Sequence, residues 1–448
     1  MKTQISHIAD ELRNNFWFTP ALMTLGAVVL STLTLTIDGH VSEEDLKAFP
    51  GLHTIVYSGD PDGARDVLAA IAKSMIGVAG VVFSITIVAL SLASNQFGPR
   101  MLENFTRDRG NQVTLGTFIS AFVYSLLVLR TVITDEPSSV PHVSVTVALA
   151  MAIAGVSVLI YFIHHISVTI QASHLVAVIG SDLQNSIDDL FPDTDEAAAD
   201  ANADANAAGP DLPDDGQGAK IAARNSGHVQ VINRERLVDI AREHDLVVRL
   251  ETRPGRFVVE TSTFALAWPA SRVTDEVAVK LAGTLVTGSR RTPVQDVELP
   301  IRQLTEVAVR SLSPSKHDPF TASACVDQLS IGLCHAAGRA FPPPTLADDE
   351  GVVRLVIGDP ITFERLIGVA FDQVRQSAAF HATVYLHLLE ALTRIADCVS
   401  SPDRLEPVLK EGRLVREAAE ASVANEADQE VIEERYGALL AAATERRS

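Results

Sequence analysis

One segment of the sequence repeats small residues at the spacing of a single helix face. Its small residues are two glycines and three serines, with a lysine one turn before them: Gly77, Gly80, Ser84, Ser91, Ser94 and Lys73. Residues three, four and seven apart share a helix face, and small side chains let membrane helices pack closely. The same face could instead line a narrow aqueous pore in an oligomer. Packing is the commoner role, and both interpretations stay open.

Ionisable residues stand near the ends of the apolar segments. Lys73 and Arg130 lie near the expected outer membrane surface, and charges at membrane depth are candidates for function. Both are close enough to that surface to extend their charged ends into water, which is the simpler explanation. His164 and His165 stand together at an inner helix end, where metal binding or proton sensing competes with an ordinary interfacial role.

A glycine–proline pair breaks the chain between the second and third apolar segments. The residues of this inner elbow that we single out are Gln96, Phe97, Pro99 and Arg100. Gly-Pro interrupts a helix, and apolar residues beside basic ones suggest a short segment on the inner leaflet. A structural elbow and a lipid or gating contact are the two interpretations.

Motifs of enzyme chemistry are absent from the sequence. It holds no Gly-x-Ser-x-Gly, phosphate-loop, His-Glu-x-x-His or Cys-x-x-Cys pattern. Arg291, Asp296 and Asp318 could converge around a cytoplasmic turn, but helix capping and ion pairing would use the same residues. Cys325, Cys334 and Cys398 lack a metal spacing, and an odd number of cysteines suits a reducing compartment. We therefore expect no enzyme, no metal and no cofactor, and no small-molecule ligand is identifiable.

Four long apolar stretches must position these residues. They run over Thr19–Ile37, Ser74–Ser94, Val113–Ile133 and His142–Ile163. Each is near the ~20 residues that carry a helix across a ~30 Å hydrocarbon core, where unbroken runs of this length are helices. The expected fold is therefore an α-helical membrane domain of four transmembrane helices, followed by a cytoplasmic α+β module and a helical C-terminal domain.

Positive charges set the expected orientation. The loop Gln96–Gln112 holds three arginines, whereas Thr134–His142 holds none. Cytoplasmic loops collect lysine and arginine, so Gln96–Gln112 is expected inside and both termini in the cytoplasm. This places the protein in a bacterial inner membrane as a multi-pass protein, with the lipid bilayer as its surroundings.

Composition changes mark the expected domains. These are a four-helix transmembrane domain at 1–175, a helical stalk at 176–192, a disordered acidic linker at 193–226, a small α+β module at 227–298 and a helical domain at 299–448. The linker is rich in Asp, Ala, Asn and Gly and cannot bury a core. The formal net charge of -20 argues against nucleic acid as a partner, because phosphate binding needs a basic face.

Two groups of motifs resemble those of a known family. The first group covers Ser74–Ser84, Ser94–Arg100, Phe105, Asp108 and Leu115–Gly116, and the second covers Arg291–Asp296, Arg310–Pro314 and Asp318–Ala322. Together they are similar to a bacterial family of predicted integral membrane proteins catalogued as a domain of unknown function, DUF2254. The resemblance implies a multi-pass membrane protein with no established activity, and it brings no catalytic residues to this chain.

Two hypotheses about function follow from the sequence. The first is a homo-oligomeric inner-membrane channel or permeation pathway with a regulatory cytoplasmic domain, suggested by the small-residue face. The second is a membrane-tethered scaffold or signalling protein that conducts nothing, in which the same face only packs against another helix. An enzyme acting at the cytoplasmic surface comes third.

Overall fold

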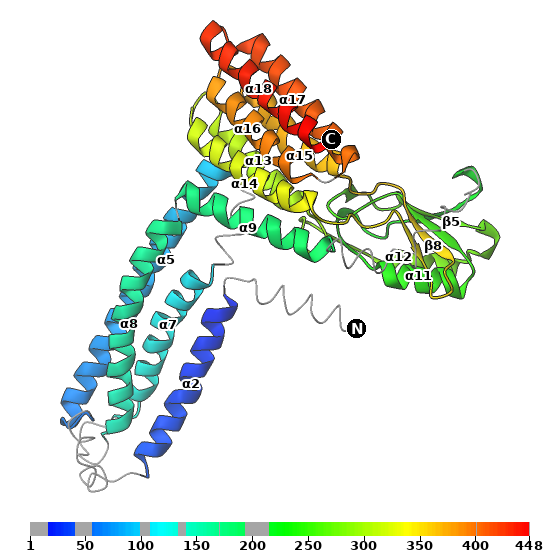
Figure 1. The fold of residues 1–448 in the computed structure, drawn as a ribbon. Coiled ribbons are helices and arrows are strands. Elements are labelled where there is room, and N and C mark those ends of the chain that lie inside the picture. The colour runs from blue at the N-terminus through cyan, green and yellow to red at the C-terminus, as the bar shows by residue number, and fades with distance from the viewer. Residues whose placement is uncertain are drawn as a thin grey trace. The chain divides into compact units, whose positions relative to one another are not determined.

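The structure is a computed structural model that describes most of the chain. The described residues are 17–40, 56–98, 108–132, 140–169, 171–192, 215–399 and 401–447. The chain divides into two compact units, Met1–His174 and Leu175–Ser448. Figure 1 shows the long helices of the first unit and the helices and strands of the second.

The first unit is built from four helices that are long and apolar enough to cross a membrane. They are α2 (Phe18–Asp38), α5 (Pro61–Phe97), α7 (Arg109–Leu129) and α8 (His142–Thr169). The helix α7 contacts the other three. Within its apolar window 56% of the residues are buried, against 22–28% for the others, so α7 is the central helix. The core around it includes Phe118, Tyr124 and Met75.

The helix α5 begins well before the predicted stretch Ser74–Ser94. Asp60 caps its first turn by accepting the Gly63 N–H at 2.9 Å, and Pro61 occupies the first helical position. Proline there loses no hydrogen bond, and aspartate at the N-cap satisfies a free N–H. The early turns bury Ala64 and Leu68. Hydropathy alone misses them because charged residues lie between these two positions.

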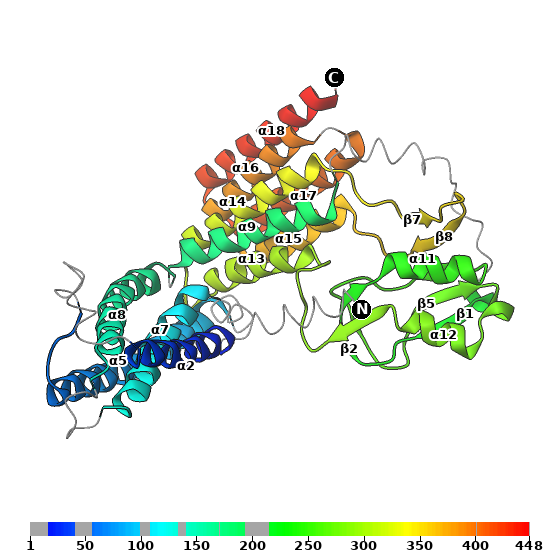
Figure 2. The ribbon, with the colours of Figure 1, turned by 90° about the horizontal axis from the view of Figure 1, so that it is seen from below.

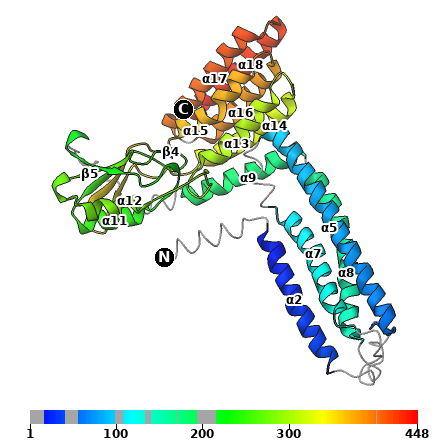
Figure 3. The ribbon, with the colours of Figure 1, turned by 180° about the vertical axis from the view of Figure 1, so that it is seen from behind.

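The predicted stalk at 176–192 is wrong as a separate element. The helix α9 (Ala172–Leu190) lies against α14 (Pro319–Ala337) in the second unit, as Figure 3 lets the reader follow. Leu183 packs closely on Gly332. A Cβ atom added to Gly332 would lie 2.3 Å from the Leu183 side chain. Asp188 contacts His335 at 2.7 Å. The apolar stripe that suggested a stalk is therefore the face that α9 buries.

Two small sheets form the mixed part of the second unit. The first has the order β1-β5-β3-β8-β7, in which β3 and β8 are parallel and the other pairs antiparallel. The second is antiparallel with the order β4-β2-β6. The strands are β1 (Ala219–Ala222), β2 (Gly227–Ile232), β3 (Val247–Leu250), β4 (Phe257–Val258), β5 (Thr263–Trp268), β6 (Leu285–Gly288), β7 (Thr345–Ala347) and β8 (Val353–Ile357).

Two helices pack against these strands. They are α11 (Arg234–Glu243) and α12 (Asp275–Ala282), and they contact each other. Figure 2 shows both beside the sheet strands. Leu237 of α11 and Leu281 of α12 are fully buried in one core with Val248 and Leu355 of the sheet. This core holds the mixed part of the unit together.

The predicted boundaries of the linker and the α+β module need correction. The linker 193–226 is too long, because β1 begins at Ala219; residues 193–214 lie outside the described residues. The module 227–298 is not contiguous, because β7 and β8 come from inside the expected helical domain 299–448. The strand β8 pairs with β3, and β1 pairs with β5. The sheet therefore includes strands that precede and follow the predicted module in the sequence.

The remaining helices form a bundle. They are α13 (Glu298–Ser311), α14, α15 (Phe363–Ser377), α16 (Ala382–Cys398), α17 (Pro402–Ser422) and α18 (Glu426–Arg447). The helix α16 contacts α14, α15, α17 and α18 and buries Leu388, Leu392 and Ile395 completely. Their spacing of three and four residues is that of one helix face, as the sequence predicts.

Candidate functional site

The small-residue face of α5 stays open in the single chain. Gly77, Gly80, Ser84 and Ser91 are all exposed, and Ser94 is half-buried. A Cβ atom added at either glycine would meet nothing within 4 Å. The hydroxyl of Ser84 donates only to the Gly80 carbonyl of its own helix, at 2.9 Å. The face therefore packs against no other described part of the chain.

This open face points away from the side that α5 buries. The buried residues of α5 include Leu68, Met75, Ala79, Val82, Ala89 and Ala93. Each helical residue turns by about 100°, which places these residues roughly opposite the line through Gly77, Ser84 and Ser91. The four-helix unit thus presents its most polar-lined α5 face to whatever surrounds it.

The charged residues at the ends of the spans lie on the surface. Lys73 and Arg130 are both exposed, and their extension toward water stays a prediction. Arg130 is the residue after the last turn of α7. Of the inner elbow, Gln96 is exposed on the last turn of α5; the side chain of Phe97 and all of Pro99 and Arg100 lie outside the described residues.

Two carboxylates fasten opposite ends of the four-helix unit. Asp38 at the end of α2 accepts hydrogen bonds from the N–H groups of Val143 and Ser144 at 2.8 and 3.0 Å, so it caps α8. Asp108 caps α7 through the Gly110 N–H and contacts His165 Nε2 of α8 at 2.6 Å. His165 thus joins two helices, whereas its neighbour His164 is exposed.

The predicted turn residues Arg291 and Asp296 form an ion pair. The guanidinium of Arg291 donates to both carboxylate oxygens of Asp296, at 2.6 and 2.8 Å. Asp296 is only 2% exposed. Gly255 lies so close that a Cβ atom on it would come within 2.5 Å of both side chains, and its φ of +85° also favours glycine. The turn at Gly255 therefore needs a residue without a side chain, because any Cβ atom would clash with this ion pair.

Beside this pair lies a buried carboxylate that the sequence analysis missed. Glu298, the first residue of α13, has a side chain that is 3% exposed. It accepts from Arg253 at 2.9 Å and from Arg302 at 2.9 Å, and it pairs with Arg365. Burial lowers the pKa of Arg253, whose other carboxylate partner is Asp359. We call Glu298, Arg253, Arg302, Arg365 and Asp359 the arginine–carboxylate cluster.

The third predicted turn residue does not join Arg291 and Asp296. Asp318 caps α14 by accepting the Thr321 N–H at 3.1 Å and the Thr321 hydroxyl at 2.6 Å. These hydrogen bonds, the hydroxyl's above all, lower the pKa of Asp318. The expected convergence of the three residues around one turn is thus corrected: two form an ion pair, and the third is an N-cap. Capping and ion pairing are their observed roles.

The cysteines are free thiols. Cys325 is buried, Cys334 is half-buried and Cys398 is exposed. Burial, with the neighbouring Cys398 as a lesser cause, raises the pKa of Cys334 to about 12, so its thiol is a poor nucleophile. Among the residues that the structure describes, no group of three His, Cys, Asp or Glu side chains could hold a metal ion.

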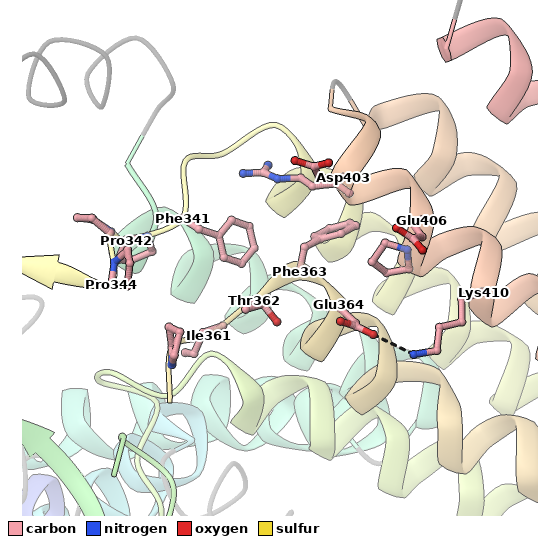
Figure 4. Close-up of a pocket in the computed structure, with 14 residues that line it drawn as sticks. Phe341, Pro342, Pro344, Ile361, Thr362, Phe363, Glu364, Asp403, Glu406 and Lys410 are labelled. Carbon is pink, nitrogen blue, oxygen red and sulfur yellow. Dashed lines mark hydrogen bonds and ion pairs between the residues drawn. The ribbon is translucent and has the colours of Figure 1, made fainter. Parts of the chain in front are cut away.

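A pocket of about 650 Å³ opens in the second unit, and Figure 4 shows its lining. Phe341, Phe363 and several prolines make its walls apolar. At its edge Lys410 pairs with Glu364 at 2.9 Å, and the guanidinium of Arg404 lies 4.8 Å from the Phe341 ring centre. Its lining carries three carboxylates and two cations. Such a pocket suits an apolar body with a positively charged group.

Comparison with known proteins identifies the family of this chain. No solved structure matches the chain. Uncharacterized proteins of Mycobacterium bovis and Mycobacterium tuberculosis are each 29% identical to it over 432 residues, which cover 95% of this chain and 80% of each relative. A family model described as "Predicted membrane protein (DUF2254)" matches residues 13–394. Because that match spans most of the chain and both groups of motifs, the chain belongs to the DUF2254 family of predicted membrane proteins.

Proposed function

We propose that this protein is a homo-oligomeric protein of the bacterial inner membrane, in which α5 helices of neighbouring copies meet around a permeation pathway. It catalyses no reaction and needs no cofactor. Both termini and the second unit lie in the cytoplasm, where the second unit regulates the pathway. The open small-residue face of α5 is the observation that carries this proposal.

The physical support is the mismatch between this face and lipid. A lipid-facing helix gains by covering itself with large apolar side chains, and α5 does so on either flank, at Ile76 and Val81. Between those flanks, besides Ile87 and Val88, it exposes glycines and serines, which offer little apolar surface to lipid tails. A ring of such faces around a central axis would give water a polar lining of hydroxyls and backbone carbonyls.

A non-conducting scaffold is the second candidate, and the spacing of the small residues favours it. Gly80 and Ser84 are four residues apart, and Gly77 precedes Gly80 by three. This small-xxx-small arrangement allows two helix backbones to approach closely in a dry contact. In that case α5 joins copies of the protein, and the second unit displays its surfaces to other cytoplasmic proteins.

A charge placed on the face separates the two candidates. If Ser84 lines water, the Ser84→Asp variant should keep its oligomer and change conductance or ion preference in a reconstituted bilayer. If Ser84 packs in a dry contact, the carboxylate is buried without a partner, which costs several kcal/mol. Oligomer size in detergent and current across the bilayer are measured together.

The matched control is Ser157→Asp. Ser157 is also an exposed serine in an apolar span, but it lies on α8 rather than on α5. It should leave both oligomer and current unchanged, apart from any general effect on insertion. A wild-type oligomer that passes no current under any voltage, together with a Ser84→Asp variant that dissociates, would contradict the channel and favour the scaffold. A wild-type monomer would contradict both.

We infer that the pocket at Phe341 and Phe363 is the place where a regulator binds. Asp403 and Glu406 both lie on its α17 wall. Pro407 has no N–H, so the Asp403 carbonyl lacks its usual helix donor four residues on and is a further acceptor at the same wall. Three acceptors beside aromatic and proline surfaces favour an amine with an apolar body.

A further inference from the structure

Two phenylalanines of the second unit stand almost fully in solvent. Phe320 is 82% exposed and Phe380 is 84% exposed, more than any other large apolar side chain that the structure describes. Single exposed apolar residues are common on protein surfaces. Two phenylalanines at this exposure on adjoining turns are a candidate interaction site.

The two turns are held together. Phe320 follows the turn between α13 and α14, and Phe380 lies in the turn between α15 and α16. The rings of His317 and His381, one from each turn, are 4.7 Å apart between centres. His317 and Phe380 both have positive φ, 48° and 71°, which is unusual for side chains of this size. The backbone thus holds Phe380 outward rather than folding it back. We call this pair of turns the phenylalanine tip.

The register of the helices puts both phenylalanines at one end of the bundle. The side chain of Asp327 contacts His387, and the Cys334 thiol donates to the Arg394 carbonyl; in both pairs the residues are 60 apart. The helices α14 and α16 are therefore parallel and in fixed register. Phe320 and Phe380 keep the same separation, so they lie level with one another at the N-terminal ends of the two helices.

The same argument connects this end to the membrane span. Along α9 and α14, Gly180 faces Gln328, Leu183 faces Gly332 and Asp188 faces His335, so these helices are parallel as well. That register sets Phe320 level with Ala172, the first residue of α9. The span α8 ends at Thr169. Ala172 follows three residues later, so the tip lies at the end of the second unit that the chain reaches first after this span.

We propose that the phenylalanine tip inserts into the lipid interface on its own side of the membrane. Aromatic side chains favour the boundary between headgroups and acyl chains. Lys316, on the same turn as His317, is exposed and can meet lipid phosphates. The carboxylate of Asp318 is engaged as the N-cap of α14, and Glu306 lies beside Arg310, so neither presents an unopposed negative charge. Insertion fixes the second unit against the bilayer independently of what α5 does.

The test uses the full chain reconstituted into vesicles of phosphatidylcholine and phosphatidylglycerol. A bimane fluorophore is attached at Ser315→Cys, an exposed position on the tip that leaves both phenylalanines in place. The background carries Cys398→Ser to remove the exposed native thiol. A lipid-borne nitroxide should quench this fluorophore, and aqueous iodide should not. The same fluorophore at Phe257→Cys, an exposed position on β4, should show the reverse.

The double variant Phe320→Ser, Phe380→Ser supplies the second measurement. In it the fluorophore at Ser315→Cys should lose most of its quenching by lipid and become accessible to iodide, while the melting temperature stays close to that of the parent, because both side chains are exposed. Equal iodide access at the tip and at Phe257→Cys would overturn the proposal. Protection from iodide without lipid quenching would overturn it in favour of a second copy covering the tip.

Discussion

At the scale of single residues, the arginine–carboxylate cluster is a buried group of ion pairs on which the stability of the second unit should depend. The carboxylate of Glu298 is almost fully buried and has ion-pair contacts with Arg253, Arg302 and Arg365. Removing one partner from a buried ion pair leaves the other charge without compensation, which is strongly destabilising. Exposed pairs lack this penalty, because water replaces the lost partner.

We therefore expect Glu298→Gln to lower the free energy of unfolding of the second unit by about 3–5 kcal/mol. The control is Glu276→Gln, which breaks an exposed pair with Lys280 and should cost less than about 1 kcal/mol. Urea denaturation can be followed by the fluorescence of buried Trp268 in a Trp17→Phe background. Equal losses in the two variants would show that the cluster carries no special stability.

Asp318 gives a pH-dependent prediction. Its pKa is lowered in the fold by the hydrogen bonds from Thr321. A group with a lowered folded pKa stabilises the protein above its unfolded pKa, and that stabilisation is lost as the pH falls through the folded pKa. Asp318→Ala should thus cost about 1 kcal/mol at pH 7 and much less near pH 3, by the same urea titration. Asp318→Asn keeps an acceptor but cannot titrate, so any loss relative to wild type should also shrink as the pH falls; a loss that is the same at pH 7 and pH 3 would contradict this account.

Only part of these residue-scale features was predictable. The pairing of Arg291 with Asp296 follows from two opposite charges five residues apart at a turn. The role of Glu298 was hidden, because Arg253 and Arg365 are 45 and 67 residues away from it in the sequence. A glutamate that opens an amphipathic helix looks like an ordinary first-turn residue. Its burial is decided by the elements packed around it, which one sequence does not reveal.

At the scale of elements, helices were easier to predict than strands. The bundle helices carry apolar residues at helical spacing, whereas β5 buries five of its six residues and lacks the alternation that marks a strand. The strands β7 and β8 lie between predicted helices; β8 pairs with β3 roughly a hundred residues earlier in the chain, and β7 pairs with β8. Their place in the sheet depends on that distant pairing.

The contact between α9 and α14 depends on glycine. A Cβ atom on Gly332 would lie 2.3 Å from Leu183, which is fully buried. Gly332→Ala should therefore force the two helices apart and cost about 1–3 kcal/mol. Gly437→Ala on α18 is the control: nothing lies within 4 Å of its added Cβ, so this change should stabilise the helix by about 0.5–1 kcal/mol. Urea denaturation should give opposite signs for the two variants; the same sign would contradict the packing argument.

At the scale of the whole molecule, the distribution of charge predicts an orientation of the chain in the membrane. Arg100, Arg107 and Arg109 lie between the end of the second span and the first turn of the third, against Arg130 alone between the third and fourth. With four spans, this bias puts the second unit on the same side as the N-terminus. Regulation of the membrane domain from the cytoplasm requires this orientation.

Labelling of intact cells with an impermeant thiol reagent tests the orientation directly. Ser58→Cys is exposed just before α5, on the side expected to face outward, and should react in intact cells. Asn225→Cys is equally exposed in the second unit and should react only after the inner membrane is permeabilised. Native Cys398 serves as a control within the unmodified chain, since its exposed thiol should follow Asn225→Cys. Reaction of Cys398 in intact cells, with Ser58→Cys protected, would invert the topology and remove the second unit from the cytoplasm.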